Sequence, residues 1–123
     1  MNRSRYIVYL TMFFFSVTWG QDCVEGVEVE LWGECYNIEE TTILDPYWSS
    51  TSGQVIPPEI GQLTNLTGLH LIDNELTGEI PSEICNQGDS SPYLNNNQLC
   101  PPYPDCGEGL ITSEGDQDTS NCP

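Results

Sequence analysis

The spacing of the apolar residues divides the chain into stretches of different character. Apolar side chains run almost without interruption from Tyr6 to Val17. Val27, Val29 and Leu31 then alternate with glutamates, which predicts a short strand with one face in water. From residue 41 to residue 99, leucines and isoleucines recur at fixed intervals between polar residues. This last pattern predicts several short elements that all bury the same kind of side chain.

The middle of the chain repeats itself. An Ile-Pro-x-Glu-Ile phrase begins at Ile56 and again at Ile80, a spacing of 24 residues. A second set recurs after 23 residues, because Leu71, Asn74 and Leu76 are echoed by Leu94, Asn97 and Leu99. A period in the twenties is typical of proteins built from stacked supersecondary units.

The best unit extends from Leu63 to Ile84, and its residue types have physical reasons. Leu69 and Leu71 flank His70, so a short strand points the leucines inward and the imidazole outward. The Asn74 amide can satisfy backbone groups where the chain bends. Gly78 permits a bend, and Pro81 fixes the start of the following short helical or extended segment.

This unit resembles the plant-type leucine-rich repeat, LxxLxxLxLxxNxLxGxIPxxI. The fixed positions are filled by Leu63, Leu66, Leu69, Leu71, Asn74, Leu76, Gly78, Ile80, Pro81 and Ile84. The resemblance implies an α/β repeat solenoid, a short right-handed coil of about two to three turns with a parallel concave sheet. We expect disulfide-stapled caps to cover its ends.

The expected organisation has four parts. Residues 1–20 form a signal peptide, and residues 21–40 form an N-terminal cap that contains Cys23 and Cys35. Residues 41–99 hold the leucine-rich repeats, one complete and two partial. Residues 100–123 form a Cys/Pro-rich C-terminal cap with an acidic tail.

The N-terminus has the features of a secretory signal. Arg3 and Arg5 precede the apolar run, and Thr18 and Gly20 are small residues before a cut at Gln21. The run is shorter than the roughly 20 residues needed to cross a bilayer. We therefore expect a secreted, extracellular product with no membrane span in the mature chain, or one held at the cell surface through a partner.

Six cysteines in a short chain indicate disulfides and an oxidising compartment. Among the 15 connectivities that six cysteines allow, we favour Cys23 with Cys35, Cys85 with Cys100, and Cys106 with Cys122. A zinc site is the alternative use. The chain has one His and no Cys-x-x-Cys pair, so its residues match zinc sites poorly.

The charge is strongly one-sided. The chain carries 19 acidic and 2 basic residues and a net charge of −17, and both basic residues lie in the first five positions. Binding to nucleic acid or to a phosphorylated substrate needs cations that the mature chain lacks. A partner should present a cationic or neutral face.

The resemblance also implies where a partner binds, because leucine-rich-repeat proteins use the variable positions on the concave strand face. The implied residues are Tyr47, Trp48, His70, Ile72, Asp73, Glu75 and Tyr93. Aromatic side chains provide large contact areas there at little cost in entropy. The alternative is that Tyr47, Trp48 and Tyr93 only pad a short core.

Little in the sequence indicates catalysis. His70 is the only imidazole, and no Gly-x-Ser-x-Gly phrase is present. We expect no enzymatic activity and no cofactor. Asp116 and Asp118 are weak calcium candidates, because oxygen ligands at alternate positions suit that cation, but the glycine and closing glutamate of a calcium loop are missing. Asn65-Leu66-Thr67 is a sequon for N-glycosylation.

Taken together, these features predict a non-catalytic secreted module that binds an extracellular protein or glycan. Two alternatives are an inhibitor of extracellular glycan-degrading enzymes and a structural or adhesive surface component bridged by calcium. A third is a truncated relative of a longer receptor-like array.

Overall fold

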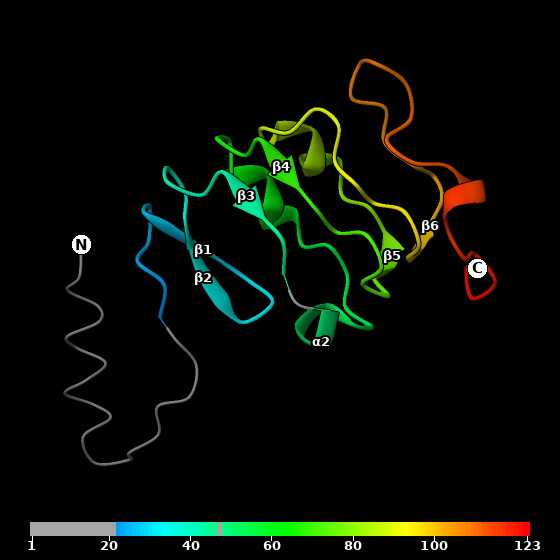
Figure 1. Ribbon diagram of the computed structural model, residues 1–123, viewed down its shortest axis with the longest axis horizontal. Coiled ribbons are helices and arrows are strands. Elements are labelled where there is room, and N and C mark those ends of the chain that lie inside the picture. The colour runs from blue at the N-terminus through cyan, green and yellow to red at the C-terminus, as the bar shows by residue number, and fades with distance from the viewer. Residues whose placement is uncertain (1–21, 47) are drawn as a thin grey trace, which may run out of the picture.

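The computed structural model describes residues 22–46 and 48–123, so the predicted signal peptide lies outside the described residues (Figure 1). The chain first forms an antiparallel hairpin of β1 (Glu28–Leu31) and β2 (Glu34–Asn37). Val29 and Leu31 are buried, as their alternation with glutamates predicts, whereas Val27 is 46% exposed. The disulfide between Cys23 and Cys35 joins the start of this segment to β2, which confirms that pairing.

Two pairs of short parallel strands follow the hairpin. β3 (Ile43–Leu44) pairs with β4 (Gly68–Leu69), and β5 (Thr77–Glu79) pairs with β6 (Gln98–Cys100). Short helices connect them: α2 (Trp48–Thr51), η1 (Pro58–Gln62), η2 (Ser82–Asn86) and, after β6, η3 (Glu114–Asp116). Figure 1 shows the hairpin at one end of the long axis and the C-terminal segment at the other. None of the helices in the described ranges is long and apolar enough to cross a membrane.

The expected solenoid with a parallel concave sheet is wrong. In residues 22–46 and 48–123 the strands pair only two by two, in three separate sheets, and no helix reaches seven residues. The strands are too short to join. Pro46 lacks an N–H to donate and follows β3 closely, and Pro92 precedes Tyr93, whose pairing with His70 is a single isolated bridge. The molecule is thus a set of small sheets around one core.

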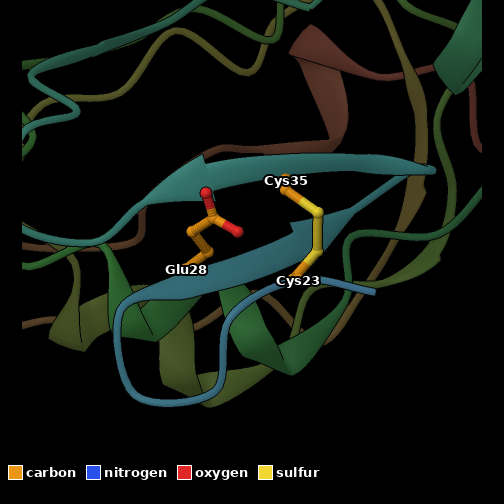
Figure 2. Close-up of side chains that lie close together, drawn as sticks. All are labelled: Cys23, Glu28 and Cys35. Carbon is orange, nitrogen blue, oxygen red and sulfur yellow. A yellow bond between two sulfur atoms is a disulfide. The ribbon is translucent and has the colours of Figure 1, made fainter. Parts of the chain in front are cut away.

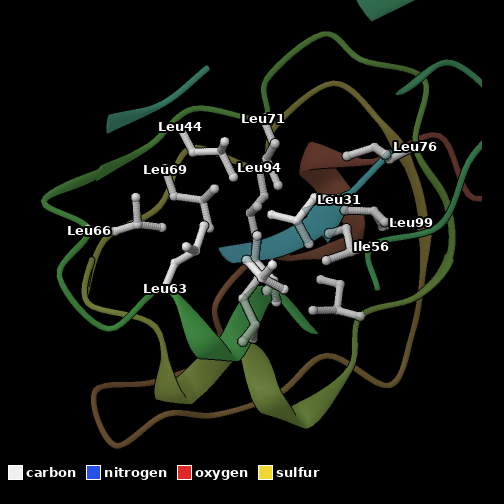
Figure 3. Close-up of a cluster of buried hydrophobic side chains, with 14 of the residues drawn as sticks. Leu31, Leu44, Ile56, Leu63, Leu66, Leu69, Leu71, Leu76, Leu94 and Leu99 are labelled. Carbon is white, nitrogen blue, oxygen red and sulfur yellow. The ribbon is translucent and has the colours of Figure 1, made fainter. Parts of the chain in front are cut away.

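The interior is filled by leucine and isoleucine. Apart from Ile72, the leucines and isoleucines of the best unit are buried, and Leu31, Leu44, Ile56, Leu94 and Leu99 join them. Figure 3 shows these side chains pointing into the space enclosed by the strands on one side and the short helices on the other. Pro57 and Pro81 are extended residues immediately before η1 and η2, which carry the buried Ile60 and Ile84. The two proline phrases therefore start the helices that close the core.

Buried polar side chains lie in a column beside the leucines. Thr51 donates to the Oδ1 of Asn74 at 2.7 Å, and the Oδ1 of Asn97 accepts from the backbone N–H of Asn74 at 2.9 Å. The Gln117 amide continues the column, because it donates to the Leu94 carbonyl at 2.8 Å. Within the described ranges, every buried side-chain polar atom has a hydrogen-bond partner. The column provides hydrogen-bond partners for buried polar groups at the bends between the small sheets.

The other two disulfides differ from the favoured pairing. Cys85 bonds to Cys106, and Cys100 bonds to Cys122. After β6 the chain returns toward η2, which brings Cys106 to Cys85. The last segment then runs beside β6, where Asp118 donates its N–H to the Asn97 carbonyl at 2.8 Å, and this places Cys122 at Cys100. All six cysteines are therefore in disulfides.

Candidate functional site

The outward side of β3 and β4 carries the residues that the sequence points to most directly. His70 follows β4 and donates its N–H to the Leu44 carbonyl at 2.8 Å, and Tyr93 donates its N–H to the Leu69 carbonyl at 2.9 Å. Because successive side chains alternate, Leu69 and Leu71 are buried whereas His70 and Ile72 face outward. We call Ile43, Gly68, His70, Ile72 and Tyr93 the outer face.

Contacts between side chains make the outer face continuous. A Cβ on Gly68 would lie 2.8 Å from the Cδ1 of Ile43 and 3.0 Å from the Nε2 of His70, so both side chains fold over this glycine. The His70 and Tyr93 rings lie with their centroids 5.4 Å apart at an angle of 43°. Ile43 is 53% exposed, Tyr93 58% and Ile72 41%. The result is an apolar and aromatic row across three chain segments.

Two predicted residues lie beside this row, at the turn after Ile72. Asp73 and Glu75 both have left-handed backbones, with φ of 61° and 54°. The Ser52 hydroxyl donates to the Oε1 of Glu75 at 2.6 Å, and the Asp73 N–H is donated to the Asn95 carbonyl at 3.1 Å. Asp73 directly follows Ile72, so its exposed side chain lies at the edge of the outer face, whereas Glu75 lines a separate hollow.

The two remaining predicted binding residues are the neighbouring aromatic residues Tyr47 and Trp48. Tyr47 lies outside the described residues. Trp48 begins α2, the short helix that leads to the buried Thr51. A different tryptophan, Trp32, packs partly buried against the core, and its Nε1 donates to the Val55 carbonyl at 3.0 Å.

Sequence reasoning missed Ile43 and Thr51. The strand that carries Ile43 is only two residues long and ends at Leu44, before Pro46. The apolar pair Ile43-Leu44 was the available signal for it. Thr51 precedes Asn74 by the same 23 residues that separate Asn74 from Asn97, so the period itself identifies its position in the buried column.

The calcium candidates lie near the C-terminus, away from the outer face. Asp118 accepts from the Ser120 hydroxyl at 2.7 Å and from the Ser120 N–H at 3.1 Å, and these hydrogen bonds hold its pKa below the ordinary value. Asp116 accepts from the Ser113 hydroxyl at 3.1 Å. Together with Glu75 they border an open hollow of about 370 Å³. Calcium binding here stays a prediction.

One group in the described residues has three potential metal ligands within 4.8 Å of one another: Cys23, Glu28 and Cys35. Figure 2 shows the Glu28 carboxylate beside the disulfide that joins the two cysteines. Sulfur atoms bonded to each other are not thiolates and do not act as thiolate metal ligands. Glu28 instead accepts from the Val24 N–H at 2.9 Å, so the group stabilises the hairpin.

No protein-family model, no curated protein and no solved structure matches the chain. The arrangement of the residues therefore carries the functional argument. It offers an exposed apolar and aromatic row with Asp73 at its edge, and a rigid backing of buried leucines and amides.

Proposed function

We propose that this protein is a non-catalytic extracellular binding module that holds a protein or glycan partner on its outer face. The observation that supports this most strongly is the continuous row of Ile43, His70 and Tyr93. These three side chains are in contact or close neighbours, and two of them are more than half exposed. A contiguous exposed apolar patch is typical of interaction surfaces.

The backing of the face also supports a binding role. Leu69 and Leu71 alternate with the outward residues and are fully buried. The Asn97 amide donates to the Leu71 carbonyl at 2.7 Å, which fixes the backbone between His70 and Ile72. A preformed surface loses little conformational entropy when a partner binds.

The charge limits the partner. All 19 carboxylates lie in the described residues, and no Lys or Arg occurs after Arg5. A cationic or neutral partner is favoured because an acidic one would be repelled. Three disulfides in a chain this small are compatible with an oxidising, extracellular setting.

His70 is a poor candidate for a catalytic group in this setting. It is the only imidazole of the chain, and its ring lies over Gly68 and beside the Tyr93 ring. In the described part of the chain the imidazole has this ring contact but no hydrogen bond, so no partner fixes its tautomer for proton transfer. We assign His70 to the binding surface.

We also propose that residues 63–84 are a single plant-type leucine-rich-repeat motif, without the solenoid that such motifs build. The 23-residue spacing of Thr51, Asn74 and Asn97 along the buried column supports it.

The test is a binding screen of the secreted, disulfide-bonded protein on arrays of extracellular protein fragments and of glycans. We expect a ligand whose binding is weakened about tenfold or more by His70→Ala and by Tyr93→Ala, as for central interface residues. Glu59→Gln is the matched control, because Glu59 is exposed on η1, across the core from the strands (Figure 3). Ligands that bind all three variants equally would refute the outer face as the site.

A further inference from the structure

A second hollow begins where the outer face ends. It has a volume of about 460 Å³ and lies between residues 84–93 and residues 106–111. Tyr93 belongs both to the outer face and to the wall of this hollow. Leu110, on the loop drawn in orange in Figure 1, lines the other side. At 62% and 58%, Leu110 and Tyr93 are the most exposed large apolar residues in the described ranges.

The wall next to the outer face is tied to β4. The Oδ2 of Asp89 accepts from the Leu69 N–H at 2.8 Å, and its Oδ1 accepts from the Ser91 N–H at 2.9 Å. Both carboxylate oxygens of Asp89 thus bind backbone donors, and the segment that leads to Pro92 and Tyr93 is fixed against the core.

The opposite wall is held just as firmly. The disulfide from Cys85 anchors Cys106, and the Oδ1 of Asp105 accepts from the N–H groups of Gly107 at 2.8 Å and Gly109 at 3.2 Å. These glycines have φ of 114° and 104°, which side chains rarely tolerate. Ile111 then donates its N–H to the Pro104 carbonyl at 2.9 Å, so the loop that presents Leu110 is closed at both ends.

The chemistry of the hollow suits a protein segment. Its apolar lining comes from Ile84, Pro92, Tyr93, Leu110 and Ile111, and its polar lining includes Gln87, Asp89, Ser90 and Ser91. The side chains of Gln87 and Asp89 already bond backbone groups, whereas the exposed Tyr93 and Leu110 suit an apolar side chain of a partner. The exposed Glu108 adds a carboxylate to the same wall, in a protein without Lys or Arg among its described residues.

We propose that this hollow binds a segment of a basic protein that presents an apolar side chain next to a Lys or Arg. The apolar side chain enters between Tyr93 and Leu110, and the cation lies near Glu108. This inference rests on the proposed function, because the hollow continues the outer face. It specifies the chemistry of the partner that the outer face binds. Charge complementarity to a chain with 19 carboxylates supports the choice of a basic partner.

The test titrates the full secreted protein with blocked tetrapeptides and observes binding by NMR. The peptides have the sequences Ala-Leu-Arg-Ala, Ala-Ala-Arg-Ala and Ala-Leu-Gln-Ala. We expect Ala-Leu-Arg-Ala to shift the methyl signals of Leu110 and Ile111 saturably. Each of the other two peptides should bind about tenfold more weakly, since each loses one of the two contacts. Equal binding of all three peptides would overturn the proposal, as would a neutral oligosaccharide that competes at the same methyl groups.

Two variants separate this inference from the proposed function. Leu110→Ser removes the exposed apolar side chain, and Glu108→Gln removes the carboxylate while keeping its shape. Both should weaken Ala-Leu-Arg-Ala, and Glu59→Gln, with the same change in charge, should not. If Leu110→Ser and Glu108→Gln bind the peptide as well as the unmodified protein does, the hollow is not the binding site. If a partner from the array screen no longer binds His70→Ala but still binds Leu110→Ser, the outer face remains its binding site even though the hollow is refuted.

Discussion

Asn97 lies directly beneath the turn that contains Asn74. Its Oδ1 accepts the backbone N–H groups of Asn74 and Leu76 at 2.9 and 3.0 Å, and its Nδ2 donates to the carbonyls of Leu71 and Leu94 at 2.7 and 2.9 Å. One buried amide therefore satisfies the backbone of two segments that are 23 residues apart. It also fixes the strand end from which His70 and Ile72 project.

We predict that Asn97→Ala lowers the free energy of unfolding by about 3 kcal/mol or more, because several buried backbone groups lose their partner at once. Urea denaturation of the disulfide-bonded protein measures this. The exposed Asn95→Ala is the control and should change stability by less than about 0.5 kcal/mol. A loss of similar size for both variants would contradict the structural role of the Asn97 amide.

Two glycines should respond differently to the same substitution. A Cβ on Gly88 would lie 2.4 Å from the Leu66 carbonyl oxygen and 2.5 Å from that of Thr64, and backbone atoms cannot move aside. We expect Gly88→Ala to cost about 3 kcal/mol or more. At Gly68 the obstacles are the ends of the Ile43 and His70 side chains, which can move. Gly68→Ala should cost about 1 kcal/mol or less in thermal melts and should weaken ligand binding, since it displaces the outer face.

Disulfide mapping tests the topology of the C-terminal part. Mass spectrometry of an unreduced digest should recover one peptide pair that joins Cys85 to Cys106 and another that joins Cys100 to Cys122. Replacing either pair by serine should lower stability by about 3 kcal/mol on the chain-entropy model. Recovery of a peptide that joins Cys85 to Cys100 would show that the return of the chain after β6 is wrong.

The periodic residues predicted local features much better than the pairing of distant segments. The spacing of Leu69, Leu71 and Asn74 gives the direction of each side chain, because a local alternation decides it. The extent of the sheets could not be predicted, since it depends on how far each ladder continues before a proline or a turn interrupts it. The partners of Cys85 and Cys100 depend on the path of the last 23 residues, and no periodic pattern covers that segment.

The same distinction applies to the candidate site. His70, Ile72 and Tyr93 were identifiable because they alternate with buried leucines or recur with the period. Leu110 was not, because it lies on an irregular loop whose position depends on the disulfide of Cys106 and on the hydrogen bonds of Asp105.

Tyr103 should make the protein less stable in alkali. Its hydroxyl donates to the Leu99 carbonyl at 2.9 Å, and burial together with the nearby Glu114 raises its pKa above the ordinary value of 10.0. Above pH 10 the unfolded chain releases this proton before the folded chain does, so the contribution of Tyr103 is complete below pH 10 and is lost as the pH rises through the raised pKa. Denaturation curves at increasing pH should show this decline.

The control for that experiment is Tyr103→Phe. It removes one hydrogen bond, worth about 1 kcal/mol, at neutral pH. It should also make the alkaline decline shallower, although Tyr36, whose pKa is raised by burial and by Glu34, keeps part of it. An equally steep decline in the variant would mean that Tyr103 ionises at its ordinary pKa.

Salt should stabilise this protein. Its 19 carboxylates have no Lys or Arg in the described residues to pair with, so the folded state brings like charges closer together than the unfolded chain does. At about 0.5 M NaCl the screening length falls to a few ångströms, which weakens this repulsion. We therefore expect the melting temperature to rise by a few degrees between low ionic strength and about 0.5 M NaCl. An equal osmolarity of a neutral solute controls for general solvent effects, and a melting temperature that is unchanged or lower in salt would mean that the carboxylates are already too far apart to repel one another.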